Sequence, residues 1–136
     1  MEFAVRTIPA VLFLGLTTAI LYMPTISIAD ELLDRYQAHL SWNDHHNTRG
    51  QRLRSVAAII RQDRANFHRY NKRDIGDTSD RFFSNLENRA RLERLLRQGR
   101  ASDHVRNLIL NSDPVIVVDV YGTGTTVRSI EVFLKP

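Results

Sequence analysis

The sequence predicts an α+β fold, with three to four short helices followed by a C-terminal β-hairpin packed on them, after an N-terminal signal peptide. Three observations support this prediction. Residues 8–22 are uncharged and largely apolar, apolar side chains recur at helical spacing through much of residues 30–110, and residues 115–135 are rich in β-branched side chains interrupted by glycines. We therefore expect residues 30–136 to form a single domain, because a chain of about a hundred residues builds one hydrophobic core.

Residues 1–29 predict export from the cytoplasm. Arg6 precedes the apolar stretch, and Ser27 and Ala29 provide small side chains at the positions that a signal peptidase recognises. We expect cleavage after Ala29. The alternative is an uncleaved anchor, because the apolar residues up to Ile28 nearly reach the ~20 that span a bilayer. We expect residues 30–136 to be periplasmic or secreted, or else held at the inner membrane through the N-terminal segment alone.

Composition limits the sites that this chain can build. No cysteine is present, which excludes disulfide bonds and thiolate-bound metals, so packing has to stabilise the domain. The 19 basic residues exceed the 15 acidic ones and give a net charge of +4. Because the arginines of residues 80–98 scatter around the expected helix instead of lining one side, nucleic acid is not an expected partner.

Four segments have the pattern of short helices. Residues 30–42 begin with acidic side chains and carry apolar ones at helical spacing. Residues 48–51 have the form of a capping box, so a second helix is expected from there to about Tyr70. A third is expected over residues 80–98, stopped by Gly99, and a fourth from a Ser102 cap to Leu110.

The C-terminal hairpin is the strongest local signal. Residues 115–121 and 126–135 are rich in β-branched and aromatic side chains, and glycines separate them. The second strand has an apolar face formed by Ile130, Val132 and Leu134. A lone hairpin is marginally stable in water, so this face has to pack on the helices or meet another chain. The hairpin is thus the expected surface for a protein partner or a homodimer.

Two groups of polar residues are candidates for chemistry. The first is His39, Asp44, His45 and His46, whose imidazole and carboxylate groups suit zinc, copper or nickel, although their spacing matches no metal motif. No other cofactor is predicted. The second is Arg64, which falls within the apolar stripe of its helix and needs either an internal salt bridge or an anionic ligand.

The expected function is therefore that of an exported, non-catalytic interaction module of the cell envelope. Two alternatives remain open: a small metal-binding protein or metal-dependent enzyme that uses the histidine cluster, and a basic binder of anionic envelope polymers or nucleic acid. No paired nucleophile and base and no cofactor fingerprint is evident, so the sequence does not favour an enzyme.

Overall fold

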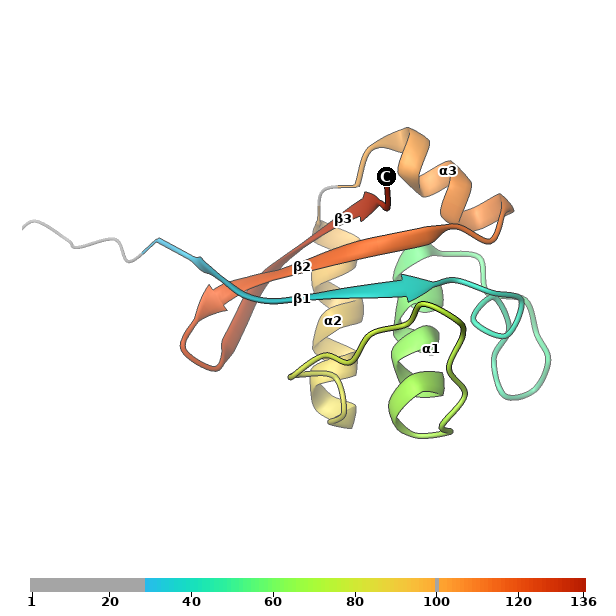
Figure 1. Cartoon of the computed structure of the whole chain (residues 1–136), viewed down its shortest axis with the longest axis horizontal. Coiled ribbons are helices and arrows are strands. Elements are labelled where there is room, and N and C mark those ends of the chain that lie inside the picture. Colours follow the sequence, from blue (N-terminus) through green and yellow to red (C-terminus); the bar gives the residue numbers. More distant parts are fainter. Residues whose placement is uncertain (1–28, 100) are drawn as a thin grey trace, which may run out of the picture.

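A computed structural model describes residues 29–99 and 101–136. Within them the elements are β1 (Glu31–His39), α1 (Val56–His68), α2 (Leu86–Gln98), α3 (Asp103–Asn111), β2 (Val115–Thr123) and β3 (Thr126–Leu134). The strands form one antiparallel sheet in the order β1-β2-β3 (Figure 1). The α+β class is confirmed, whereas the leader predicted at residues 1–29 lies, except for Ala29, outside the described residues. None of the described helices has the length and apolar character needed to cross a bilayer.

The prediction of a helix at residues 30–42 is wrong, because this segment forms strand β1. Its apolar positions fit both the helical period of about 3.6 and the strand period of two, and the structure uses the period of two: Tyr36, Ala38 and Leu40 are buried, while Gln37 and His39 between them are only partly buried. Pairing with β2, which lies far away in the sequence, decides between the two. A short segment that matches both patterns takes its structure from tertiary contacts.

The C-terminal hairpin is confirmed. β2 and β3 are joined by a tight turn in which Gly124 has a φ of 60°, a left-handed value that favours glycine. The ladder shifts register next to Gly122, where a side chain would collide with the carbonyl oxygen of Thr126. The apolar face of the hairpin packs on the helices of the same chain: Ile130 and Val132 are buried and Leu134 is partly buried.

Helices α1 and α2 begin later than predicted. Ser55, and not Thr48, caps α1 by accepting a hydrogen bond from the amide of Ala58. Residues 48–51 instead form the tip of a small turn, closed by a bond from the amide of Asn47 to the carbonyl of Gln51. Asn85 caps α2, and the predicted Ser102 cap of α3 is confirmed.

The hydrophobic core lies between the sheet and the helices. α1 and α2 run side by side in opposite directions below the sheet, and α3 lies near the start of β2 (Figure 1). The central strand contributes Ile116, Val118 and Val120, which are fully buried. The N-terminus of α1 follows a loop over residues 41–54, and this loop and α1 together build the sites described below.

Candidate functional site

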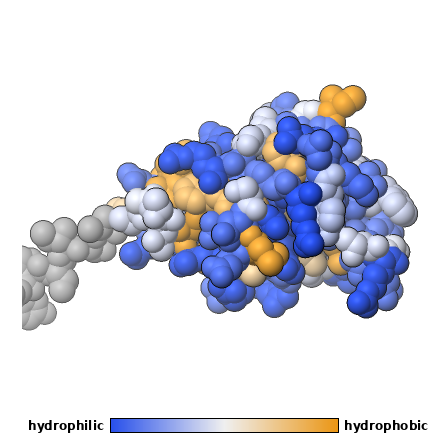
Figure 2. All heavy atoms as spheres, turned by 90° about the horizontal axis from the view of Figure 1, so that it is seen from below, coloured by the Kyte–Doolittle hydropathy of each residue, from blue (hydrophilic) through white to orange (hydrophobic). Residues whose placement is uncertain are grey.

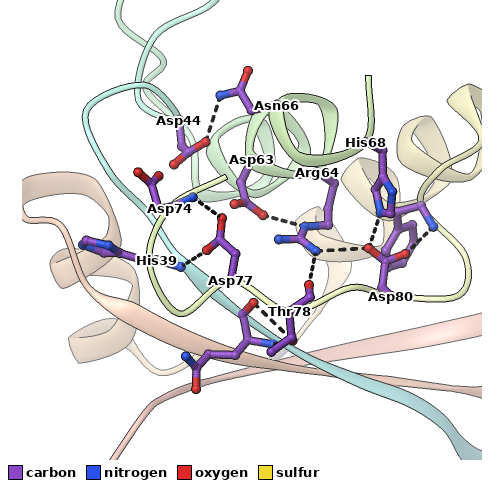
Figure 3. Close-up of polar contacts among 12 residues, drawn as sticks. His39, Asp44, Asp63, Arg64, Asn66, His68, Asp74, Asp77, Thr78 and Asp80 are labelled. Carbon is purple, nitrogen blue, oxygen red and sulfur yellow. Dashed lines mark hydrogen bonds and ion pairs between the residues drawn. The ribbon is translucent and has the colours of Figure 1, made fainter. Parts of the chain in front are cut away.

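The predicted metal ligands do not converge. His39 donates its backbone amide to Asp77, while the Asp44 carboxylate accepts from the side-chain amide of Asn66 at 2.9 Å (Figure 3). His46 contacts the carbonyl oxygen of Trp42 through Nδ1, at 2.8 Å. The described residues contain no group of three or more histidine and acidic side chains arranged to hold a metal ion.

His45 is buried and contacts two backbone carbonyls of the same chain. Its Nδ1 lies 2.9 Å from the carbonyl oxygen of Ser41 and its Nε2 lies 2.7 Å from that of Ile109. Both ring nitrogens are thus occupied by backbone carbonyls, and neither presents a free lone pair to a metal ion. The contact with Ile109 joins the 41–54 loop to α3.

Arg64 lies at the centre of a buried polar network. Its Nε donates to Asp63 at 2.6 Å, and its Nη1 donates to Asp80 at 3.1 Å and to the carbonyl of Thr78 at 3.0 Å (Figure 3). His68 contacts the same Asp80 carboxylate at 2.6 Å. The structure therefore places Arg64 in an internal salt bridge. Its guanidinium carbon also lies over two aromatic rings, 4.3 Å from the centre of Tyr36 and 4.6 Å from that of Phe67.

Burial sets the protonation behaviour of the carboxylates in this region. It raises the pKa of Asp44 to about 6 and raises that of Asp63, against the lowering effect of the neighbouring Arg64 guanidinium. Burial also acts to raise the pKa of Asp80, but hydrogen bonds from His68 and the Phe83 amide, with the charge of Arg64, lower it overall. This region thus combines two carboxylates, Asp44 and Asp63, that burial disfavours as anions with one, Asp80, that its partners hold ionised.

A hollow of about 250 Å³ opens beside α1, between the 41–54 loop and the start of α2. We call it the basic hollow. Three arginines line it, Arg61 and Arg69 from α1 and its C-terminal cap, and Arg89 from α2. Small side chains of α1 lie between them, at Ala58 and Ala65. None of the described residues that line this hollow is acidic.

The three arginines differ in how they are neutralised. Arg61 forms an ion pair with Glu93 at 3.0 Å. Arg89 is buried, and its side-chain partners among the described residues are two backbone carbonyls, those of Phe83 and Ser84. Burial lowers the pKa of Arg89, and the positive charges of Arg61 and Arg69 lower it further. Within the described residues, Arg69 and Arg89 form no ion pair with a carboxylate, so the hollow carries unbalanced positive charge.

A second hollow, of about 260 Å³, adjoins the first, and we call it the aromatic hollow. Trp42 and His46 form a stacked pair at its edge, with ring centroids 4.0 Å apart. Tyr70 also lines it and is held in place by the end of α1, where Asn71 takes a left-handed φ of 51° and the Lys72 amide donates to the Asn66 carbonyl. The two hollows share four lining residues, Asn47, Thr48, Gln62 and Tyr70.

The sequence analysis did not predict the two hollows, although the spacing of two of their lining residues was visible in the sequence. Gln62 and Arg69 are seven residues apart and therefore share one face of a helix. Nothing in the sequence indicates that Trp42 is exposed, because the segment before it fits a buried amphipathic helix equally well. Trp42 follows the end of β1 at His39 and lies in the loop after it. The helix prediction did not place the end of an element there.

The predicted hairpin surface is mostly used inside the chain. Only 2% of Ile130 and 3% of Val132 is exposed, so neither residue is available to a partner in this conformation. The opposite face of β3 carries Phe133, which is 44% exposed and lies across from Val117 of β2. A partner surface on the hairpin would therefore have to use this other face.

Comparisons with protein-family models, with curated proteins and with solved structures found no match for this chain. The two hollows and the charges around them are the features of this structure that bear on its function.

Proposed function

We propose that this protein is an exported, non-catalytic binding module of the cell envelope, which holds an anionic ligand in the basic hollow. The observation that carries the proposal is the convergence of Arg61, Arg69 and Arg89 on one hollow with a single carboxylate partner, Glu93, among the described residues. Cations gathered in this way repel one another, and a bound anion relieves the repulsion.

The geometry of these side chains suits an acidic group. Guanidinium groups present planar sets of donors that match carboxylate, phosphate or sulfate oxygens. Arg89 is fixed by its bonds to the Phe83 and Ser84 carbonyls, while Arg69 is exposed and contacts the ring of Tyr70 at 5.3 Å, with no side-chain hydrogen bond among the described residues. A fixed cation and an exposed one on the same hollow favour capture of an anion from solution.

Isothermal titration calorimetry with tripolyphosphate, an anion without rings, tests this proposal. We expect binding that weakens steeply between 20 and 200 mM NaCl, because the ligand competes with salt for the arginines. Arg69→Ala should weaken binding by roughly ten- to 150-fold, which corresponds to the ~1.5–3 kcal/mol of a charge-assisted hydrogen bond. Arg106→Ala, at an exposed arginine of α3 that does not line either hollow, is the matched control.

Two results would remove this proposal. One is the absence of any heat of binding at low salt, and the other is an equal loss of affinity in Arg69→Ala and Arg106→Ala, which would indicate attraction by net charge alone.

A second candidate function is association with a protein partner or a second copy through the outer face of the hairpin. The exposed Phe133 next to Val117 favours it, because a large apolar side chain on an open sheet face is a common contact residue. Size-exclusion chromatography with light scattering tests the homodimer. Loss of a dimer in Phe133→Ser would support it, and a monomer at high concentration would exclude it.

A further inference from the structure

We propose that the aromatic hollow is a sugar-binding subsite, so that the complete ligand is an acidic oligosaccharide. One sugar ring would pack on Trp42, and an acidic group on an adjacent unit would reach the arginines. This inference rests on the proposed function, because the basic hollow supplies the site for the acid. The sugar subsite adds two points to the proposed function. It names the chemical class of the ligand, and it assigns a second binding site next to the anion site.

Trp42 is the first observation behind this inference. Its side chain is 64% exposed although it is the largest apolar side chain available, and one of its faces is covered by the imidazole of His46. The Nδ1 contact from His46 to the Trp42 carbonyl fixes the pair. A rigid indole with one free face offers the flat apolar surface on which the C–H groups of a pyranose ring pack.

The polar groups around the indole suit hydroxyl groups. Gln62 donates through Nε2 to Asn66, which leaves its Oε1 as an acceptor, while Thr48 and Lys72 add a hydroxyl and an ammonium group. Sugar hydroxyls both donate and accept, so they match a mixed set of this kind. The volume of about 260 Å³ is below the roughly 300–1,000 Å³ of sites that enclose whole drug-sized ligands, which favours one ring.

The placement of the charges favours a glycan over a nucleic-acid strand. A strand carries a phosphate at every nucleotide, so cations are expected beside each stacked base. Lys72 is the only lysine or arginine among the described residues that line the aromatic hollow, and the arginines gather in the neighbouring hollow. Because the hollows share Gln62 and Tyr70, a ligand of two or more units can fill both, with its ring in one and its acidic group in the other.

The chain offers a direct probe, because Trp42 is its single tryptophan. Tetrasaccharides of galacturonate, mannuronate and hyaluronan are titrated while tryptophan emission is recorded, with cellotetraose as the neutral counterpart and a thymidine octanucleotide as the strand. We expect at least one acidic sugar to change the emission and to bind more tightly than cellotetraose. By calorimetry, Trp42→Ala should weaken its binding by tenfold or more, and Trp42→Tyr should restore most of it.

Variants separate the two proposals. Ile75→Ala, at an exposed apolar residue outside both hollows, should leave sugar affinity unchanged, and circular dichroism checks the folding of each variant. If Arg69→Ala weakens binding of an acidic sugar but Trp42→Ala does not, the sugar subsite is refuted and the anion site stands. If only neutral sugar binds, and through Trp42, the anion site fails instead. Tighter Trp42-dependent binding of the octanucleotide, or no response to any of the three acidic sugars, overturns the inference.

Discussion

The two sides of α1 treat charge in opposite ways. On the side toward β1, Arg64 is fully buried and is paired with Asp63 and Asp80. Toward α2 and the 41–54 loop, Arg61 and Arg69 border the basic hollow, and of these two only Arg61 has a carboxylate partner within the described residues. One helix therefore carries both a closed polar network and an open basic surface.

The difference shows which charges belong to the fold and which are free for a ligand. A buried ion that loses its partner is costly, so the residues around Arg64 are constrained to remain as they are. An arginine at the surface contributes little to stability, and its unpaired charge is available for binding. Seen from the side where α1 ends and α2 begins, the surface is mostly hydrophilic (Figure 2).

The largest expected effect comes from breaking the closed side. Arg64→Ala leaves Asp63 and Asp80 buried without their cation and should destabilise the protein by ~3–5 kcal/mol. Urea denaturation followed by circular dichroism measures the change. A loss below 1 kcal/mol would show that the network is solvated and that the contrast between the two sides is not real.

A change of pH tests the buried carboxylates without a mutation. Because burial raises the pKa of Asp44 from 3.8 to about 6, the folded state binds this proton more tightly than the unfolded state, and stability should rise as pH falls from about 7 toward 4. The gain from Asp44 is at most about 3 kcal/mol. Below about pH 4 stability should fall again, because the lowered pKa of Asp80 marks a carboxylate that is more stable ionised.

Asp44→Asn is the control for this pH dependence, because asparagine does not titrate. Melting temperatures at pH 5 and pH 8 should differ less in the variant than in the unchanged protein. Equal differences would assign the effect to other groups.

The N-terminal cap of α1 stabilises the helix that carries both Arg64 and Arg61. Ser55→Ala removes the side-chain cap of this helix and should cost ~1 kcal/mol. Ser55→Asp should restore most of that loss, because aspartate caps equally well and favours the positive end of the helix dipole. Thermal denaturation of the unchanged protein and the two variants measures these changes. A Ser55→Ala variant with unchanged stability would show that the helix starts at another residue.

The smallest effect is expected on the open side. Arg69→Ala should change the free energy of unfolding by less than ~0.5 kcal/mol, because this exposed side chain has no carboxylate partner among the described residues. The same urea titration as for Arg64→Ala provides the measurement. A loss comparable to that of Arg64→Ala would make Arg69 a structural residue and remove its availability for a ligand.

Local sequence signals identified the hairpin and the cap of α3, since turn glycines and capping serines act on residues nearby. They failed at β1, where Tyr36 and Leu40 fit helix and strand alike, and where pairing with residues 115–122 decides the outcome. They also failed at Thr48 and Gln51, whose capping-box pattern is used in a turn. The two hollows could not be predicted, because each is built from a loop and helices that only the tertiary fold brings together.

The pairing of β1 with β2 has a consequence for how the chain acquires its structure. Residues 31–39 cannot complete their ladder until residues 115–122 have been synthesised. Loop closure over so long a separation is entropically costly and slows folding. The first strand thus stays unpaired for most of synthesis, so the sheet can form only after residues from both ends of the described domain are available.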